Sequence, residues 1–455
     1  MLNDTIAAIS TAHGKGGVAM IRISGENALE VCKRVVRTKA NSIEPRKCYY
    51  GEILRQGEVI DDGIMTYYKA PHSFTGEDVC EICCHGGIYV TEAVLQSVLS
   101  CGARMAEAGE FTRRAYINGR LTLTRAEAII NVIDAKTDSQ LRLSSSTARG
   151  ALSRKLSVIR EEMLKLISHA YACVDYPDED IEDSTREEME LSLTYVKSEL
   201  TRLKGSYKAG RAISEGIKTA IIGKPNAGKS SLYNMLLGEE LAIVTDIAGT
   251  TRDIIEHTVS VGGVTLNLAD TAGIRSTDDT VEKIGVERAR EKIDTSELLL
   301  LVFDSSLKET DEDAFILECA KGKACIGIIN KTDTEMRISP EFEEKIKQEC
   351  SKTVYLSTKS FLGEEELARA VTELYDLGSI NISSDAIISN ARAHASVSLS
   401  LDAVEEAVEA LNFGQTPDIV LFALERALGE LDMIDARGVG EEIVSAIFSR
   451  FCVGK

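Results

Sequence analysis

The stretch Gly223-Lys-Pro-Asn-Ala-Gly-Lys-Ser230 follows the apolar, β-prone residues 217–222 and precedes a helical pattern over 231–237. A strand, a glycine-rich loop and the start of a helix form the phosphate-binding loop of nucleotide hydrolases. The two glycines allow backbone N–H groups to turn toward the phosphates. Lys229 supplies a cation for the β- and γ-phosphates, and Ser230 supplies a hydroxyl for Mg²⁺. The alternative is a surface turn that matches by chance, which the flanking strand and helix disfavour.

The overall composition describes an acidic chain with several domains. Its 455 residues are enough for two or three domains with separate cores, and its formal net charge is −20. We expect no membrane span, because no run of about 18 apolar residues occurs, and no secretory signal. The eleven cysteines indicate reduced thiols in a cytoplasmic protein. The negative charge argues against a broad phosphate-binding surface, so a partner or a local patch would have to bind any nucleic acid.

Residues 1–119 alternate short β-type runs with turns, which predicts an α+β domain. Gly14-Lys-Gly-Gly17 lacks the rest of a phosphate-binding loop and is interpreted as a turn. Cys80-Glu-Ile-Cys83-Cys84-His85 has metal-like spacing, but no second cysteine pair follows it, so buried thiols on a strand explain it better. We expect strands at 5–9 and 18–23, a hairpin from 49–54 to 64–68 across 56–63, and helices at 25–36 and 91–100.

Helical periodicity begins at Leu121 and occurs on both sides of the central region. Apolar stripes with helical spacing run over 152–170, 193–203, 401–411 and 421–431. The acidic stretch 175–190 is expected to be a solvated loop or a helix entrance. We expect the helices to pack into one all-α domain that carries the central domain as an insertion, in preference to two independent bundles. The predicted organisation is an N-terminal domain 1–119, a first helical segment 120–215, an α/β phosphate-loop domain 216–377 and a second helical segment 378–455.

The central region carries further motifs in the order found in GTPases. The polar loop Thr245–Thr251 suits a switch, and its last threonine can contact Mg²⁺. A strand at 266–270 leads into Asp270-Thr-Ala-Gly273. Asp270 suits an indirect role at Mg²⁺, and Gly273 can offer its N–H to the γ-phosphate. Buried parallel strands are expected at 298–303 and 325–329.

The last two motifs indicate which base is bound. Asn330-Lys-Thr-Asp333 ends in an aspartate that can accept both N–H donors of guanine, and Leu356-Ser-Thr-Lys359 supplies a loop that closes over the base. Five motifs in order, each at a strand end, predict a GTP site. The predicted GTP-binding residues are Asn226, Ala227, Gly228, Lys229, Ser230, Ser231, Thr245, Asp246, Ile247, Ala248, Gly249, Thr250, Thr251, Asp270, Thr271, Ala272, Gly273, Asn330, Lys331, Asp333, Ser357, Thr358 and Lys359, with Ser230 and Thr251 at Mg²⁺.

The residues that would orient the attacking water are less clear. Many GTPases place a glutamine after the glycine of Asp-x-x-Gly, but Ile274 and Arg275 follow here. Either hydrolysis is slow, or another group positions the water. Arg252 and Arg275 are candidates for stabilising charge in the transition state, and the alternative for both is a place on the switch surface.

The whole chain resembles the MnmE (TrmE) family of tRNA-modification GTPases. The markers are the phosphate-binding loop, Asp246–Asp253 and Asp270–Arg275, together with Ser73-Phe-Thr-Gly-Glu-Asp78, His85-Gly-Gly87 and Phe451-Cys-Val-Gly-Lys455. The terminal motif is highly specific, whereas many GTPases share the phosphate-binding loop. The resemblance implies that K⁺ replaces the missing glutamine and arginine, at a site completed when two GTPase domains meet. The residues that match its ligands are Asn226, Thr245, Ile247 and Thr250.

The resemblance also implies a general base and a second ligand. Glu282 matches a base that acts through water, although the residues alone would make it a solvated helix position. The N-terminal domain is implied to have a folate-binding fold, to form a homodimer and to bind 5-formyl-tetrahydrofolate or a related one-carbon donor. Cys452 is either a nucleophile near cationic groups or a packing residue. The implied folate-binding residues are Arg22, Glu81, Lys455 and Arg120, which stands where some members carry lysine.

The family acts with a FAD-binding partner, MnmG, in an expected heterotetramer. Together they add an aminomethyl-type (carboxymethylaminomethyl) group at carbon 5 of the wobble uridine of tRNA. The leading hypothesis is therefore a K⁺-stimulated GTPase of tRNA modification, and the alternative is a ribosome-assembly GTPase switch. Such switches usually carry a second GTPase domain or a basic RNA module, and neither is visible in the sequence. The lack of membrane spans disfavours an iron transporter with a similar GTPase domain.

Overall fold

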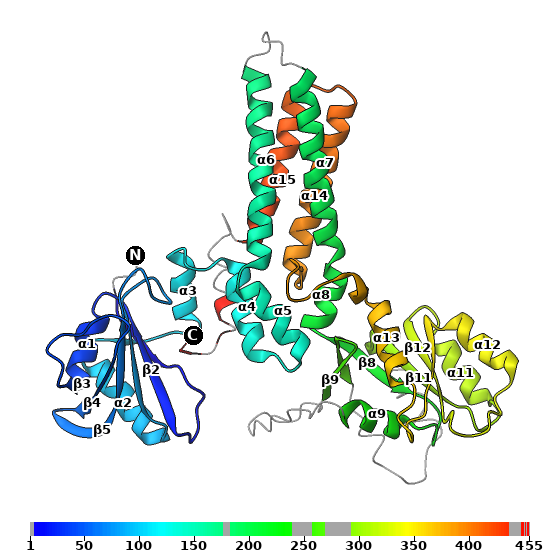
Figure 1. Cartoon of the computed structure of the whole chain (residues 1–455), viewed down its shortest axis with the longest axis horizontal. Helices are drawn as coiled ribbons and strands as arrows, with labels where there is room; N and C mark the ends of the chain where they lie inside the picture. Colours follow the sequence, from blue (N-terminus) through cyan, green and yellow to red (C-terminus); the bar gives the residue numbers. More distant parts are fainter. Residues whose placement is uncertain are drawn as a thin grey trace. The chain divides into compact units, whose positions relative to one another are not determined.

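The computed structural model describes residues 4–175, 183–238, 257–268, 293–435, 447–449, 451 and 453–454. The chain divides into two compact units. Unit 1 consists of Met1–Ile130 with Asp432–Lys455, and unit 2 consists of Asn131–Leu431. The two ends of the chain therefore belong to the same unit (Figure 1). The limits of the four segments proposed from the sequence remain predictions.

Within the described residues, unit 1 is built on a seven-stranded sheet of order β3-β4-β5-β6-β2-β1-β7. All neighbouring strands are antiparallel except β1 and β7, which are parallel. Two amphipathic helices, α1 and α2, cover one face, where Val31 and Val94 pack with Ile21 and Ile82. The elements are β1 (Ile6–Ile9), β2 (Val18–Ser24), α1 (Ala28–Val35), β3 (Val36–Thr38), β4 (Cys48–Arg55), β5 (Glu58–Tyr68), β6 (Val79–His85), α2 (Ile88–Ser100), β7 (Arg104–Met105), α3 (Glu110–Ile117) and α4 (Leu123–Asp134).

One expectation for this unit was wrong, and one of its helices was not predicted. The hairpin between β4 and β5 turns at Gln56 and Gly57, so the loop predicted over 56–63 is mostly strand. Both turn residues have positive φ, 52° and 87°, as a two-residue hairpin requires. Glu58–Gly63 then extends β5 as a strand with partly exposed polar side chains. Helix α3 was not predicted, because its short sequence contains buried polar residues such as Glu110 and Arg114.

In unit 2, helices that precede the central insertion in the sequence pack against helices that follow it, which confirms the prediction of one helical domain. Helices α6, α7, α14 and α15 run side by side (Figure 1). Lys197 of α7 pairs with Glu405 of α14 at 3.0 Å, and Ser400 of α14 donates to the carbonyl of Ala427 in α15 at 2.8 Å. These elements are α5 (Asp138–Ala148), α6 (Ala151–Asp175), α7 (Asp183–Gly205), α8 (Tyr207–Ser214), α14 (Ala391–Asn412) and α15 (Pro417–Ile434).

The central insertion contains a sheet of order β13-β12-β11-β8-β10-β9 within the described residues. The strands are parallel except that β9 is antiparallel to β10. In such a sheet the carboxyl ends of the parallel strands meet at one edge, where ligands bind. The elements are β8 (Ile217–Ile222), α9 (Lys229–Gly238), β9 (His257–Val261), β10 (Val264–Leu268), β11 (Leu298–Asp304), α11 (Asp311–Cys319), β12 (Ala324–Asn330), α12 (Pro340–Glu349), β13 (Lys352–Tyr355), α13 (Glu364–Leu374) and η1 (Leu377–Ser379).

Strand β11 shows why this sheet is buried on both faces. Leu299 and Leu301 pack with α11 and α12, while Leu298 and Leu300 pack with α9 and α13. A parallel strand between two layers of helices has a continuous apolar sequence. The two buried parallel strands predicted from such runs are therefore confirmed. Across the described ranges, no helix is long and apolar enough to cross a membrane.

Candidate functional site

The phosphate-binding loop connects β8 to α9, at the carboxyl end of a central strand. Asn226 and Gly228 have positive φ of 62° and 102°, which asparagine and glycine adopt more readily than other residues. The Nζ of Lys229 donates to the carbonyls of Gly223 and Lys224, both at 2.7 Å. The structure thus places the predicted residues 226–231 in the loop and the first turn of the helix. Ser230 is exposed in that turn, and its role at Mg²⁺ remains a prediction.

Asn330 joins the phosphate-binding loop to the two base motifs. Its buried side chain donates from Nδ2 to the carbonyl of Ala227 at 2.9 Å. Its Oδ1 accepts from the backbone N–H of Thr358 at 3.2 Å. One amide therefore connects three stretches that lie far apart in the sequence, at the carboxyl ends of β8, β12 and β13.

The Asp333 carboxylate lies at the surface beside this junction. Its Oδ1 accepts from the hydroxyl of buried Ser357 at 2.7 Å. That hydrogen bond lowers the pKa of Asp333 below its ordinary value, so the group is ionised at neutral pH. An oriented carboxylate can accept two parallel N–H bonds, which guanine offers and adenine does not. The geometry therefore fits a guanine base.

Two buried carboxylates support these loops. Lys331, with a positive φ of 66°, pairs through Nζ with Oδ2 of Asp304 at 2.5 Å. Burial of Asp304 opposes its ionisation, but the bonds from Lys331 and Ser306 outweigh this effect and lower its pKa. In the phosphate-binding loop, Lys224 pairs with Asp313 of α11 at 2.7 Å.

The structure leads us to expect that Gly228→Ala weakens GTP binding by about tenfold or more. A Cβ at this position would lie 2.1 Å from Nδ2 of Asn330, and the backbone φ of 102° is strained for alanine. Both effects displace the amide that connects the three loops. Titration with a fluorescent GTP analogue measures the change. Gly238→Ala, at the end of the same helix, is the matched control, because no described residue lies within 4 Å of a Cβ placed there. Equal affinity in the two variants would contradict this account.

Arg22 and Glu81 in unit 1 lie opposite each other on β2 and β6. Nη2 of Arg22 is 2.8 Å from Oε1 of Glu81. The guanidinium carbon also lies 5.5 Å and 5.9 Å from the ring centres of Phe74 and Phe111, within cation–π range. Arg120 is exposed, and its side chain packs beside Gly76. The structure thus brings Arg22 and Glu81 together, and the loop that carries Phe74 also lies beside the side chain of Arg120.

Val453 and Gly454 of the C-terminal motif contact unit 1 beside its sheet. The hydroxyl of Ser10 donates to the carbonyl of Gly454 at 3.0 Å, and Val453 forms an antiparallel bridge with Ala108. Residues separated by 444 positions are therefore in contact. Cys80 and Cys84 are buried on strand β6, as expected, whereas Cys83 on the same strand is only half-buried.

Many predicted site residues lie outside the described residues of the chain, and their roles remain predictions. They are Thr245, Asp246, Ile247, Ala248, Gly249, Thr250, Thr251, Arg252, Asp270, Thr271, Ala272, Gly273, Arg275, Glu282, Cys452 and Lys455. Sequence reasoning also missed residues that the structure brings to the sites. Lys224 belongs to the phosphate-binding loop, but only its partner 89 positions later explains its burial. Asp304 ends an otherwise apolar run, and that polar position was the local signal that could have identified it.

Two family models and full-length relatives match this chain. The family model described as "GTP-binding protein TrmE N-terminus" matches residues 5–120, and that described as "MnmE helical domain" matches residues 123–452. The "tRNA modification GTPase MnmE" of Clostridioides difficile (strain 630) is 41% identical over 460 residues, and the match covers 100% of both chains. The protein of the same name from Acetivibrio thermocellus is 40% identical over 459 residues, and the match covers 99% of each.

A solved structure matches about a third of the chain. The G domain of the T. maritima FeoB iron transporter is 27% identical, and the match covers 35% of this chain and 98% of that one with a TM-score of 0.26. The family models and the full-length relatives agree with each other, and the three nucleotide-binding loops meet as a guanine site requires. The chain belongs to the MnmE family of tRNA modification GTPases.

Proposed function

We propose that this chain hydrolyses GTP and that the hydrolysis serves the modification of tRNA. The observation that carries the GTP assignment is the junction at Asn330, which ties the phosphate-binding loop to the loops around the carboxylate of Asp333. The tRNA assignment rests on membership of the family. The finer proposal is that, with a FAD-binding MnmG partner, the chain adds a carboxymethylaminomethyl-type group at carbon 5 of the wobble uridine.

K⁺ is proposed to take the place of two residues of other GTPases, the glutamine that orients water and the arginine that stabilises charge in the transition state. When bound between β- and γ-phosphates, it neutralises charge that develops in the transition state. Asn226 fits this role because it lies exposed in the phosphate-binding loop and offers an amide oxygen. Thr245, Ile247 and Thr250 would add hydroxyl or carbonyl oxygens, Ser230 and Thr251 would bind Mg²⁺, and Glu282 would act as the base.

GTP turnover should be faster in K⁺ than in Na⁺, and Asn226→Ala should abolish most of that difference. One well-placed electrostatic ligand contributes on the order of 10²–10³ in rate, so the loss should be at least about tenfold. GTP affinity should change less, because Lys229 and the loop N–H groups remain. The measurement is steady-state turnover in matched KCl and NaCl, together with GTP titration. Asn234→Ala on the exposed face of α9 is the control. Full K⁺ stimulation in Asn226→Ala would exclude this residue as the ligand.

A folate one-carbon donor is proposed to bind unit 1 at Arg22, Glu81, Arg120 and Lys455. Glu81 offers acceptor oxygens to the amino and ring N–H groups of a pterin, and the cations suit the carboxylates of its glutamyl tail. The preceding residue, Gly454, accepts a hydrogen bond from Ser10 at the end of β1, whereas Lys455 itself lies outside the described residues. A homodimer through unit 1 and Cys452 as a nucleophile belong to the same proposal.

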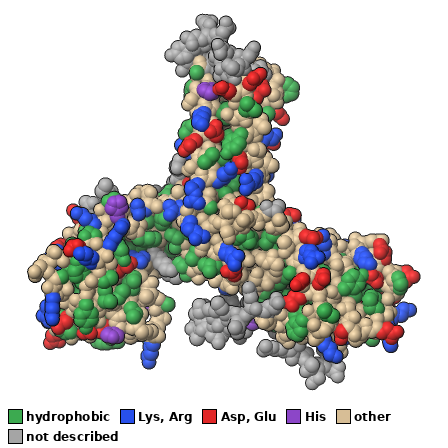
Figure 2. All heavy atoms as spheres, in the orientation of Figure 1, with side chains coloured by type: hydrophobic (Ala, Val, Ile, Leu, Met, Phe, Trp, Pro, Cys, Tyr) green, Lys and Arg blue, Asp and Glu red, His purple; other side chains and the backbone are tan. Residues whose placement is uncertain are grey.

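The surface charge supports a partner that supplies much of the RNA contact. Figure 2 shows Lys and Arg side chains interspersed with Asp and Glu along the helical bundle on this face. Several cations on the helices of the bundle are paired, such as Lys155 with Glu199 at 2.5 Å and Arg426 with Glu406 at 2.5 Å. Paired charges release few counterions from nucleic acid.

Nucleoside analysis of tRNA separates this proposal from a role in ribosome assembly. A strain that lacks the gene should lose the modified wobble uridine, and the wild-type gene should restore it. Complementation with a Lys229→Ala variant tests the requirement for the GTP site, because this lysine is the cation of the phosphate-binding loop. Unchanged wobble uridines in the deletion strain would refute the proposed function.

A further inference from the structure

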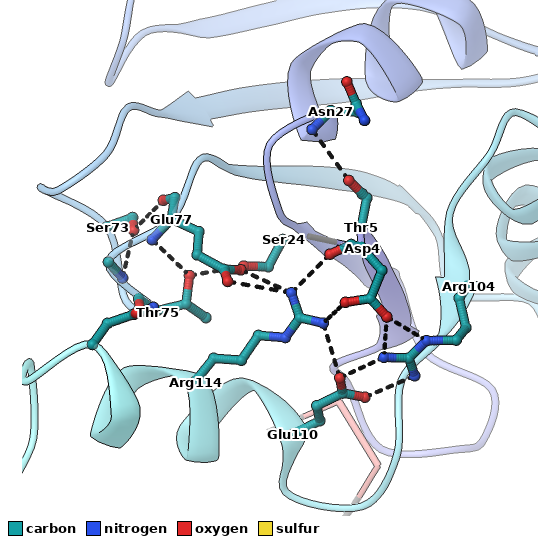
Figure 3. A network of polar contacts seen from close by, with 12 residues as sticks. Asp4, Thr5, Ser24, Asn27, Ser73, Thr75, Glu77, Arg104, Glu110 and Arg114 are labelled. Carbon is teal, nitrogen blue, oxygen red and sulfur yellow. Dashed lines mark hydrogen bonds and ion pairs between the residues drawn. The ribbon is translucent and has the colours of Figure 1, made fainter. Parts of the chain in front are cut away.

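A buried cluster of charged groups joins the start of the chain, a loop and helix α3 in unit 1. Its centre is Arg114, whose side chain is 1% exposed (Figure 3). One terminal nitrogen of the guanidinium, Nη2, donates to Oδ1 of Asp4 at 2.7 Å and to Oε1 of Glu110 at 3.0 Å. The other, Nη1, donates to the carbonyl of Asp4 at 2.9 Å and to Oε2 of Glu77 at 3.1 Å. Both terminal nitrogens are therefore committed to charge-assisted bonds within the chain.

Glu77 connects this cluster to the Ser73–Asp78 loop, which consists of Ser73-Phe-Thr-Gly-Glu-Asp78. Its Oε2 also accepts from the hydroxyl of Ser24 at 2.8 Å, and that hydroxyl bonds to Oγ1 of Thr75 at 2.7 Å. The hydroxyl of Ser73 donates to the carbonyl of Glu77 at 2.5 Å, which closes the loop on itself. Figure 3 shows these bonds running from the loop to Arg114. The loop conformation therefore depends on the charge of Glu77 being matched by Arg114.

The same loop supports two arginines of the proposed folate site. Phe74 gives Arg22 one of its two aromatic neighbours, and the other, Phe111, lies on α3 three residues before Arg114. Gly76 has a positive φ of 81°, and a Cβ there would lie 3.2 Å from Cγ of Arg120. A shift of the loop relative to α3 would change the surroundings of both arginines.

We propose that Arg114 is a positioning residue of the folate site, which fixes the Ser73–Asp78 loop against α3 and thereby orients Arg22 and Arg120. This inference rests on the proposed binding of a folate donor. Arg114 does not itself bind the donor, because its terminal nitrogens are occupied by Asp4, Glu77 and Glu110. The competing explanation is that Arg114 only stabilises the fold.

Arg104 provides a matched control for that competing explanation. It bonds to two of the three carboxylates that Arg114 contacts, with Nη2 2.7 Å from Oε1 of Glu110 and 2.6 Å from Oδ2 of Asp4. Within the described residues, the hydrogen bonds of Arg104 go to Asp4, Met105 and Glu110 and not to Glu77. Arg104→Gln therefore perturbs the cluster from the side away from the loop. Arg114→Lys keeps the charge but cannot bond to Asp4, Glu77 and Glu110 in the fork geometry of a guanidinium.

The first measurement is the affinity of the full-length chain for 5-formyl-tetrahydrofolate by calorimetry, with thermal unfolding followed in parallel. We expect both variants to lower the unfolding temperature, whereas only Arg114→Lys weakens folate binding, by about tenfold or more. Equal affinity in folded Arg114→Lys and wild type would overturn the inference while leaving the folate proposal intact. If the wild-type chain does not bind the folate, the proposed function fails and the inference falls with it.

The second measurement follows the loop without any ligand. The chain has no tryptophan, so Phe74→Trp introduces a single fluorescent reporter on the loop. Adding Arg114→Lys should increase quenching of this tryptophan by acrylamide, and adding Arg104→Gln should not. If Arg114→Lys does not fold, Glu77→Gln replaces it, because this variant removes the charge at the loop end of the same bond. A reporter that is quenched equally in all backgrounds would refute the positioning role.

Discussion

Asp333→Asn should lower the affinity for GTP by on the order of 100-fold, the largest effect expected from any single change in the base-binding loops. The carboxylate accepts charge-assisted hydrogen bonds, and asparagine loses both the charge and one acceptor. Its amide group would instead donate a hydrogen bond toward a carbonyl at the same position of the base. We therefore expect xanthosine triphosphate, which carries a carbonyl there, to bind the variant better than it binds the wild-type protein.

Competition titrations against a fluorescent nucleotide test both halves of this prediction. Ser357 bonds to the same carboxylate and remains in place, so the loss reports on the base contact and not on collapse of the loop. Glu335→Gln, two residues further along and also exposed, is the control and should bind GTP as the wild type does. If Asp333→Asn kept wild-type affinity for GTP, the guanine assignment would be wrong.

Lys224→Met should destabilise the phosphate-loop domain by about 3–5 kcal/mol, the cost of leaving a buried charge without its partner. The side chains of Lys224 and Asp313 are only 10% and 3% exposed, and their charged atoms are 2.7 Å apart. Oδ2 of Asp313 also accepts from the N–H and the hydroxyl of Thr310, both at 2.9 Å, at the start of α11. Those neutral donors cannot replace the lysine charge. The carboxylate must then either take up a proton or draw in water, and both weaken the start of the helix.

Thermal unfolding by circular dichroism measures the loss, and a double-mutant cycle with Asp313→Leu identifies its cause. Replacing both partners by apolar residues should recover most of the stability, since the buried charge is then absent. Lys347→Met is the matched control, because Lys347 pairs with Glu343 on α12 at 2.6 Å but is 43% exposed. An exposed pair contributes little. Equal shifts in the Lys224 and Lys347 variants would contradict the assignment of a buried pair.

The sequence determined those features that depend on a short stretch of chain. The phosphate-binding loop needs a strand, two glycines and a helix start, which follow one another closely along the chain, and the structure has them in that order. Continuous apolar runs identified β11 and β12, because a strand covered on both faces has few polar positions. Helical periodicity identified the apolar stripes of the helices before and after the insertion, which pack against each other. Motifs with fixed spacing identified the base-binding loops.

Only the tertiary structure decided which distant residues meet. Asn330 bonds to Ala227 across 103 positions, Arg114 to Asp4 across 110, and Ser10 to Gly454 across 444. Periodicity reports which face of an element is buried, but it does not say which other element covers that face. From the sequence alone, a charged residue such as Arg114 or Lys224 is therefore expected at the surface. Only the fold shows that carboxylates surround it in a buried site. A polar contact is electrostatically stronger in a buried environment than in water, and burial depends on the packing of the whole unit.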